Sequence, residues 1–442
     1  MKKILFIASF MLIAIFAMST TVYAADVATE ADLEAALAGT DATITLTANV
    51  ELTKSLEVGR TVTLDLKEFN ITAKDGMTDD SLIIVLHGGA LTVKGTGSIS
   101  ATNANASARI AVKMTKAGNT ADFINNNPAK LVLNSGVLEG TSFGISGNGN
   151  DDRVNTIVEI NGGKVEGAAT GIYHPQEGKL TINGGTVEGK TGIEMRSGDL
   201  LVNGGTIIGT GSPATSTGNG NGSTTVGAGI AVAQHTTEKN INVVVKGGSV
   251  QGYSALYESN PQSNTTMDKV VLKIEGGNFE TINNGTDAIY SEDKTDFITG
   301  GTFSTDVEDY IDTSKTAVKD ETTGEYYVGV ESKITVKAGL NGKAIAAEKA
   351  VEGQPVKITV TPDKNYELAS IKVTDAAGTE VTVKDNTFTM PGSDVTVEVT
   401  FKEMAKDGTP ATGSMNVVML VSAAIAVTTF GVLVSKKYSI DQ

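Results

Sequence analysis

Asp151, Asp152 and Arg153 form the only compact acidic and basic cluster of this 442-residue sequence. Paired carboxylates can hydrolyse a glycosidic bond. The cluster directly follows residues 147–150, whose alternating glycine and asparagine predict a loop. We therefore interpret these charges as part of a turn, with a catalytic site as the alternative.

The three histidines are the next candidates for chemistry. His174 follows Tyr173 and precedes Pro175 at the end of an expected strand, where an imidazole could act as a base. A single surface histidine is more often inert, and we expect no catalysis there. His87 and His235 have no neighbours at metal-ligand spacing. The sequence therefore predicts no catalytic residue, no metal site and no cofactor.

Tyr173, Tyr257 and Tyr290 recur at matching positions of successive repeat units. Aromatic rings at such positions could line one outer face and stack on sugar rings. The alternative is that the tyrosines only fill space between neighbouring units. Aromatic residues make up only 5% of the chain, which is low for a dedicated glycan-binding protein.

The bulk composition argues against several classes of function. The sequence has no cysteine, which excludes disulfides, thiol catalysis and thiolate metal sites. The formal net charge is −16, whereas nucleic acid binding requires clustered lysine and arginine. We therefore expect no nucleic acid partner.

A glycine pair recurs through the middle of the chain. This repeat determines how the strands that carry the candidate histidines and tyrosines are arranged. The clear copies occupy residues 158–167, 180–189 and 200–209, and looser copies occupy residues 243–252, 272–280 and 297–304. Each clear copy reads as alternating apolar residues, Asn-Gly-Gly, a second short strand and another glycine. A unit of this length cannot bury its own apolar face, so successive units must stack.

Each repeat unit contains three short strand-like parts, separated by glycine corners. In the unit that begins near residue 180, the alternation predicts that Ile182, Val187 and Ile193 point inward. Three strands per unit of about 22 residues predict a parallel β-helix. Asparagines recur at one corner and are expected to form a structural ladder of side-chain amides; they are Asn161, Asn183 and Asn203.

Over residues 45–305 this pattern resembles the pectate-lyase-like, right-handed parallel β-helix superfamily, and we estimate about 8–10 coils. A short helix that begins after Thr29 and ends near Leu37 is expected to cap the open end of the stack. Residues 212–225 are rich in Gly, Asn, Ser and Thr, and we expect them to project from one coil into solvent.

Beyond residue 332 the glycine pairs stop and two-residue alternation replaces them, which predicts a small antiparallel β domain. Residues 362–366 and 390–394 resemble the Pro-x-x-Gly-Tyr and Met-Pro-x-x-Asp landmarks of repeat modules on bacterial surface proteins. The resemblance implies a stalk or spacer.

The N-terminus has the pattern of a secretory signal peptide. Two lysines precede an apolar run, and small residues precede the expected cleavage site between Ala24 and Ala25. The alternative is an uncleaved membrane anchor.

The C-terminus combines a short motif, an apolar run over residues 417–434 and a basic tail that contains Lys436 and Lys437. The motif consists of Thr409, Pro410, Ala411, Thr412 and Gly413. An apolar run of this length can span a membrane, and the lysines would remain on the cytoplasmic side. The alternative is a plain membrane anchor.

This order resembles the LPXTG-type cell-wall sorting signal of Gram-positive surface proteins, with Thr409 in place of the usual leucine. The resemblance implies that a sortase cleaves between Thr412 and Gly413. It also implies that the sortase joins Thr412 to peptidoglycan, after a membrane-anchored intermediate.

These features predict an all-β protein with terminal signal and anchor helices. Its expected parts are a signal peptide (1–24), an N-terminal cap helix and strand (25–44), a parallel β-helix (45–305), a connector (306–332), a small antiparallel β domain (333–403) and a cell-wall sorting signal (404–442).

The expected function is that of a non-enzymatic protein of the Gram-positive cell wall, for adhesion or contact with carbohydrate, host or wall polymers. A polysaccharide lyase or glycoside hydrolase is the first alternative, and a purely structural wall protein is the second. An outer strand face with three or more acidic residues and one basic residue would favour the enzyme.

Overall fold

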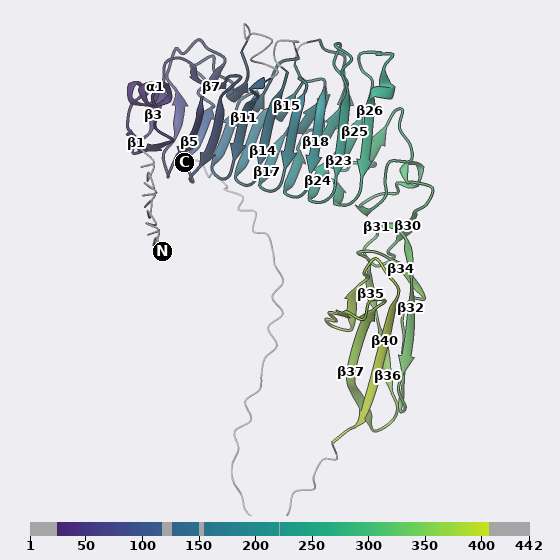
Figure 1. The fold of residues 1–442 in the computed structure, drawn as a ribbon. Coiled ribbons are helices and arrows are strands. Elements are labelled where there is room, and N and C mark those ends of the chain that lie inside the picture. Colours follow the sequence, from purple (N-terminus) through teal and green to yellow (C-terminus); the bar gives the residue numbers. More distant parts are fainter. Residues whose placement is uncertain (1–23, 117–125, 150–153, 221, 406–442) are drawn as a thin grey trace, which may run out of the picture. The chain divides into compact units, whose positions relative to one another are not determined.

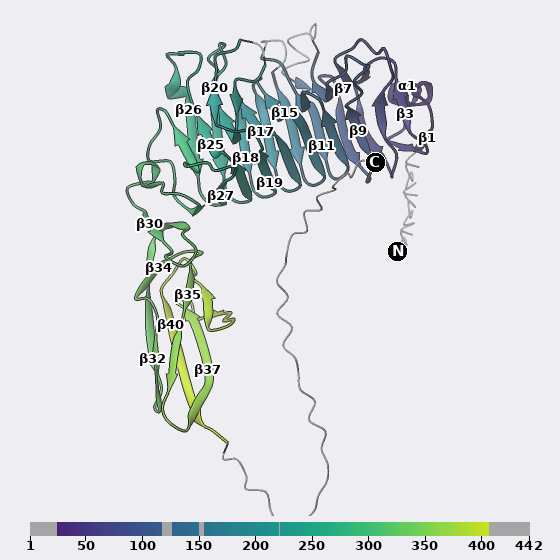
Figure 2. The same cartoon turned by 180° about the vertical axis from the view of Figure 1, so that it is seen from behind.

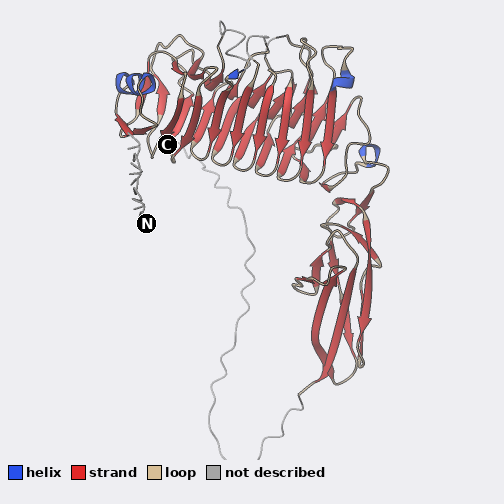
Figure 3. Cartoon of the chain, viewed as in Figure 1, coloured by secondary structure: helices blue, strands red, loops and turns tan. Residues whose placement is uncertain are grey.

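A computed structural model describes residues 24–116, 126–149, 154–220 and 222–405 (Figure 1). The body of the signal peptide, the acidic cluster around Asp152, the sorting motif and the apolar run 417–434 lie outside these residues. Within the described ranges, no helix has both the length and the apolar character needed to cross a membrane. Strands account for most of the described chain, and helices are few and short (Figure 3).

The first of two large sheets contains ten parallel strands, and its order follows the chain (Figures 1 and 2). In that order the strands are β1 (Ala24–Val27), β2 (Thr43–Leu46), β5 (Thr61–Asp65), β8 (Ala90–Lys94), β11 (Ala129–Leu133), β14 (Thr156–Ile160), β16 (Gly178–Ile182), β18 (Gly198–Val202), β23 (Ile241–Val245) and β26 (Val270–Ile274). Every strand therefore pairs with the strand of the next repeat unit, as the repeat pattern requires.

The second large sheet contains two series of strands that also pair in parallel from unit to unit. The second strand of each unit belongs to the series β3 (Val50–Leu52), β6 (Ile71–Ala73), β9 (Ser98–Ala101), β12 (Val137–Gly140), the first half of β15 (Lys164–His174), the first half of β17 (Thr186–Met195), β19 (Thr206–Gly209), β24 (Ser249–Gly252), β27 (Asn278–Thr281) and β29 (Gly301–Phe303).

The third strand of each unit belongs to the series β4 (Leu56–Val58), β7 (Ser81–Val85), β10 (Ile110–Met114), β13 (Phe143–Ser146), the second halves of β15 and β17, β22 (Ala228–Val232), β25 (Ser254–Glu258) and β28 (Ile289–Ser291). A small separate hairpin of β20 (Thr215–Ser216) and β21 (Thr225–Val226) lies between β19 and β22 in sequence, while β17 and β22 pair directly with each other.

The inward positions of the strands form one continuous apolar core. Ile182, Val187 and Ile193 are all completely buried, which confirms the orientation expected from their alternation. Near the C-terminal end of the stack, the rings of Phe279 and Phe303 lie 5.1 Å apart and close to parallel. The apolar faces of successive units thus cover one another, as expected for units that cannot fold alone.

The glycine corners allow the units to approach closely. A side chain at Gly184 would place its Cβ 2.7 Å from the carbonyl oxygen of Asn161 in the preceding unit. The amide of Asn183 donates to Asn161 at 2.8 Å, and the amide of Asn203 donates to Asn183 at 2.8 Å. The predicted asparagine ladder is confirmed, and Asn134 extends it by accepting from Asn161 at 3.0 Å.

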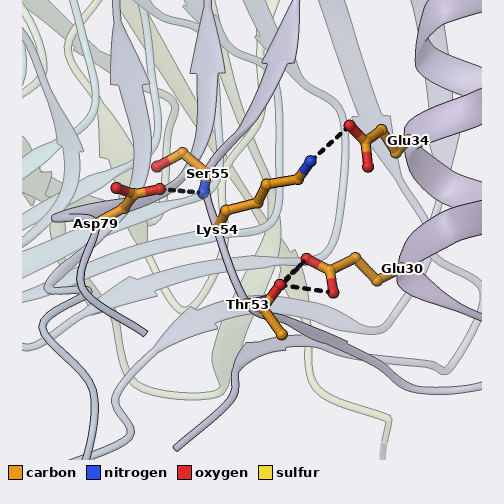
Figure 4. A network of polar contacts seen from close by, with 6 residues as sticks. All are labelled: Glu30, Glu34, Thr53, Lys54, Ser55 and Asp79. Carbon is orange, nitrogen blue, oxygen red and sulfur yellow. Dashed lines mark hydrogen bonds and ion pairs between the residues drawn. The ribbon is translucent and has the colours of Figure 1, made fainter. Parts of the chain in front are cut away.

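Helix α1 (Glu30–Ala38) packs against the first strands, with Leu33 completely buried. The side chain of Thr29 accepts a hydrogen bond from the backbone of Asp32 at 3.2 Å, so the expected N-cap is present. Polar contacts between α1 and the loop that connects β3 to β4 add to this packing (Figure 4). Glu30 accepts from the backbone of Thr53 at 2.8 Å, and Lys54 reaches Glu34 at 2.7 Å.

Residues 306–332, which we expected to be a connector, contain ordered structure. The short helix η3 (Glu308–Tyr310) precedes an antiparallel hairpin of β30 (Thr316–Lys319) and β31 (Tyr326–Gly329). Strand β31 also pairs antiparallel with β29, so the hairpin continues the second sheet. Another short helix, η2 (Met267–Lys269), directly precedes β26.

The C-terminal β domain has its own core, which includes Ile334, Val356, Phe388 and Val397. Its strands are β32 (Glu331–Ala338), β33 (Gly342–Ile345), β34 (Lys349–Val351), β35 (Pro355–Lys357), β36 (Thr359–Pro362), β37 (Tyr366–Asp375), β38 (Glu380–Val381), β39 (Thr387–Thr389) and β40 (Val395–Glu403).

The expectation that this domain is antiparallel is wrong for one pair of strands. β32 and β40 are parallel, with Val336 opposite Val397, whereas the pairs β32–β34, β33–β36, β35–β39 and β37–β38 are antiparallel. Parallel neighbours need a long crossover connection. Strands β32 and β40 have such a connection, because all the other strands of the domain lie between them in sequence.

Candidate functional site

The three tyrosines lie in one column of register partners on the third strands. Tyr257 is opposite Tyr290, and Tyr173 belongs to the same column through Glu194 and Ala231. Their side chains share a face because partners in a parallel sheet point the same way. The surroundings of the three rings nevertheless differ.

Tyr173 is almost completely buried, with an exposed fraction of 5%. Its ring stacks on Phe143 with the two centroids 5.2 Å apart, and its hydroxyl oxygen accepts a hydrogen bond from Arg196 at 3.2 Å. Burial raises the pKa of the Tyr173 hydroxyl, which stays protonated at neutral pH. With one face stacked on Phe143 and almost no exposed surface, this ring has no open face for a sugar to stack on.

Tyr257 and Tyr290 stack on each other with centroids 4.7 Å apart and an angle of 17° between the ring planes. Tyr290 is 36% exposed and Tyr257 is half-buried. Each ring covers one face of the other, so this pair presents less open aromatic surface than two separate rings. The packing is consistent with the filler role that we kept as an alternative.

Most described residues of the first part of the insertion, 212–220, are exposed, as expected, whereas its last residues, 222–225, lie against the third strands. Two side chains at the end of β17 hold the insertion, Glu194 within the strand and Arg196 directly after it. Glu194 accepts hydrogen bonds from the backbone and the hydroxyl of Thr224, at 2.7 and 2.5 Å. The guanidinium of Arg196 donates to the carbonyl oxygens of Gly222 and Asn219, at 2.7 and 2.8 Å.

Sequence reasoning missed Glu194 and Arg196, although both are completely buried. The only feature of the sequence that could have revealed their burial was their position. They flank the inward-facing Met195 at the end of β17, where the register partners of Glu194 are Tyr173 and Ala231. Charged side chains are rarely fully buried without partners, so the nearby polar insertion was the natural source of those partners.

A cavity of about 420 Å³, which we call the outer hollow, opens beside this insertion. Its floor comes from the third strands β10, β13 and β15, and its walls come from the loops around residues 147–149, 220 and 235–237. The residues that line it are Asp80, Ile110, Lys113, Phe143, Ser146, Gly147, Asn148, Gly149, Tyr173, Pro175, Gly220, Gly222, His235, Thr236 and Thr237.

Polar groups of both hydrogen-bonding types surround the outer hollow. Lys113 forms an ion pair with Asp80 at 2.6 Å. One imidazole nitrogen of His235 lies 3.1 Å from the Gly220 carbonyl, and the other accepts from the backbone of Thr237 at 3.2 Å. Burial and the charge of Arg196 lower the pKa of His235, so the imidazole is neutral at pH 7. Half-buried Phe143 supplies an apolar surface within this polar ring.

The described part of the outer hollow is poorly suited to acid–base hydrolysis. Two carboxylates are needed, and the only one among its described residues is Asp80, which is held by Lys113. Glu194 lies beneath the insertion, where burial raises the pKa of its carboxyl. No group of three or more histidine or acidic side chains is placed to hold a metal among the described residues. Asp151, Asp152 and Arg153 fall outside them.

The expectation that His174 is a surface residue is wrong, because this histidine is part of the core. It is 1% exposed, and its Nδ1 lies 3.0 Å from the carbonyl oxygen of Ser197. Burial lowers the pKa of His174 to about 4, which leaves the imidazole neutral. A ring enclosed in this way cannot reach a substrate.

The second strands carry an acidic outer face of the kind that would favour an enzyme. Glu139, Glu166 and Glu188 are successive register partners, and Lys164 lies beside them. Lys164 pairs with Glu166 at 2.7 Å and with Glu188 at 3.1 Å. The hydrogen bond that Lys164 donates to Glu166 raises the pKa of Lys164, so this lysine is a poor base. The residue types on this face fit the enzyme alternative. The ion pairs of Lys164 with the glutamates instead fit a structural network of charges.

One comparison with known proteins finds a similarity for part of the chain. The family model described as the divergent InlB B-repeat domain matches residues 332–405. These residues coincide with the C-terminal β domain, which is therefore similar to the B-repeat domains. Neither the curated proteins nor the solved structures include a match to this chain.

Proposed function

We propose that this protein is a non-enzymatic surface protein, secreted and joined to the wall of a Gram-positive bacterium, that contacts carbohydrate through the outer hollow. In this proposal residues 45–305 form a right-handed parallel β-helix of the pectate-lyase-like type. The C-terminal β domain acts as a spacer between that region and the wall.

The surface location is supported by three separate segments. The B-repeat-like domain belongs to a family typical of surface proteins. The N-terminal segment has a signal-peptide pattern that ends at Ala24, and the C-terminal segment has a sorting-signal pattern around Thr412. Sortase and peptidoglycan are the partners that this arrangement implies.

The outer hollow is the single observation that carries the carbohydrate proposal. Its volume of about 420 Å³ falls within the range of small-molecule sites. It combines an aromatic surface with charged, hydroxyl and backbone groups that can donate or accept hydrogen bonds. Sugars present both apolar ring faces and many hydroxyls, so they match this combination better than a purely apolar or purely ionic ligand.

The proposal is tested by presenting a panel of wall and host glycans to the full chain, purified in detergent, and scoring both binding and cleavage. We expect binding without product formation. Lys113→Ala should weaken binding about tenfold, because it removes a charged donor from the outer hollow. Lys179→Ala is the matched control on the first sheet and should leave the affinity unchanged.

Two results would count against the proposal. Release of shortened products would favour the lyase or hydrolase alternative. Equal binding by the parent and by Lys113→Ala would show that carbohydrate contacts another surface.

A further inference from the structure

The hydroxyl of Tyr173 has a fixed role in hydrogen bonding. The guanidinium of Arg196 can only donate, so the tyrosine oxygen must be the acceptor of their 3.2 Å bond. The hydroxyl proton of Tyr173 must then point elsewhere. Among the described residues, no hydrogen bond takes this proton, and Tyr173 lines the outer hollow. Tyr173 is therefore positioned to donate to an oxygen atom of a ligand.

The neighbouring hydroxyl, that of Ser146, can accept a hydrogen bond from a ligand. Ser146 is the register partner of Tyr173 and also lines the outer hollow. Its hydroxyl donates to the carbonyl oxygen of Gly147 at 3.3 Å, which leaves the Ser146 oxygen able to accept. A donor and an acceptor thus lie on adjacent strands at one part of the floor.

An apolar surface completes this part of the floor. Phe143 stacks on the ring of Tyr173 and is itself only half-buried. A ligand group that suits all three side chains needs a carbonyl oxygen, an N–H group and a small apolar end. The acetamido group of an N-acetylated amino sugar has these three features.

We propose that the outer hollow selects N-acetylated amino sugars, with the acetyl oxygen on Tyr173, the amide on Ser146 and the methyl group on Phe143. This inference rests on the proposed carbohydrate contact and adds the class of sugar. A site that donates to a particular ligand oxygen discriminates against analogues without that oxygen, because its buried donor is then left unpaired.

The test compares three tetrasaccharides by titration calorimetry on the full chain in detergent. They are a tetramer of N-acetylglucosamine, the same tetramer after removal of its acetyl groups, and a glucose tetramer. We expect the acetylated tetramer to bind at least about tenfold more tightly than the other two. The glucose tetramer controls for the positive charge that deacetylation creates.

Tyr173→Phe should remove this preference, because the ring remains while the donor is lost. Tyr257→Phe is the matched control, since this tyrosine belongs to the same column but not to the outer hollow. If Tyr173→Phe fails to fold, the three tetramers on the parent protein still decide the question.

The possible failures are distinguishable. Equal affinity for the three tetramers would overturn the inference and leave the carbohydrate proposal intact. An unchanged preference in a folded Tyr173→Phe variant would also overturn it. Absence of binding to every tetramer and to the wider glycan panel would contradict the proposed function itself.

Discussion

Arg196 and Glu194 show how buried charges can shape a surface. Each is removed from water and hydrogen-bonded to the insertion, where Gly222 and Thr224 supply the partners. Because an unpaired buried charge is costly, these bonds hold the insertion on the third strands. The insertion in turn forms one wall of the outer hollow. Two residues that touch solvent very little therefore determine the shape of the candidate site.

A first prediction at this scale concerns the inward face. Ile182→Asp should destabilise the protein by several kcal/mol, roughly the cost of placing an unpaired carboxylate in an apolar core. Thr181→Asp is the control, because Thr181 is only half-buried on the outward side of the same strand. Thermal unfolding measures both variants. Similar melting temperatures for the two would contradict the assigned orientation.

A second prediction concerns the buried imidazole of His174. Its pKa is about 4 in the folded protein, against an ordinary value of 6.5. Between these values the unfolded chain binds more protons, so stability should fall as the pH is lowered from 6.5 towards 4. The full difference corresponds to roughly 3 kcal/mol.

The measurement is the free energy of unfolding as a function of pH for the parent and for His174→Met, which matches the neighbouring Met195. The difference between the two curves isolates the histidine from the buried carboxylate of Glu194. Burial raises the pKa of that carboxyl, so its effect has the opposite sign. Parallel curves for the two proteins would show that His174 titrates normally.

At the scale of elements, the corner between the first and second strands is the feature that repeats most strictly. Gly185 has a positive φ of 76°, and the preceding glycine lies close to the backbone of the unit before it. Asn183 satisfies its side-chain amide within the ladder, between Asn161 and Asn203. Close stacking, backbone conformation and hydrogen bonding therefore select the same three residues, Asn-Gly-Gly, in successive units.

A third prediction follows from this corner. Gly184→Ala should destabilise the stack, because the new Cβ would lie 2.7 Å from a backbone oxygen that cannot move aside easily. Gly220→Ala is the matched control, since a Cβ there has no neighbour within 4 Å. We expect a loss of about 1–3 kcal/mol for the first variant and little change for the second. Chemical denaturation measures both, and equal midpoints would contradict the close approach of the units.

Across the whole molecule, the features that could be predicted from sequence are those that recur in every repeat unit. Parallel pairing, the inward face around Ile182 and the asparagine ladder all follow from residues that recur with one period. The parallel pair β32–β40 had no such signal, because alternation specifies a strand but not its direction. The outer hollow depends on the insertion, whose path is determined by Glu194 and Arg196 and not by any repeat.

A fourth prediction concerns the attachment of the whole chain. Replacing Thr412 and Gly413 together by alanine should leave the protein in the membrane fraction, because the expected sortase cleavage site is lost. Digestion of walls with muramidase, followed by immunoblotting, measures the linked fraction. The parent should be released with wall fragments. Unchanged release of the double variant would contradict attachment through this motif.

The central claim, that carbohydrate binds in the outer hollow, is tested most directly by hydrogen exchange with and without the tightest-binding glycan of the panel. We predict that protection appears in the loops at residues 147–149 and 235–237, which line the outer hollow. The acidic second-strand face around Lys164 provides the internal comparison and should not change. Protection confined to that face, with none in the two loops, would contradict the account.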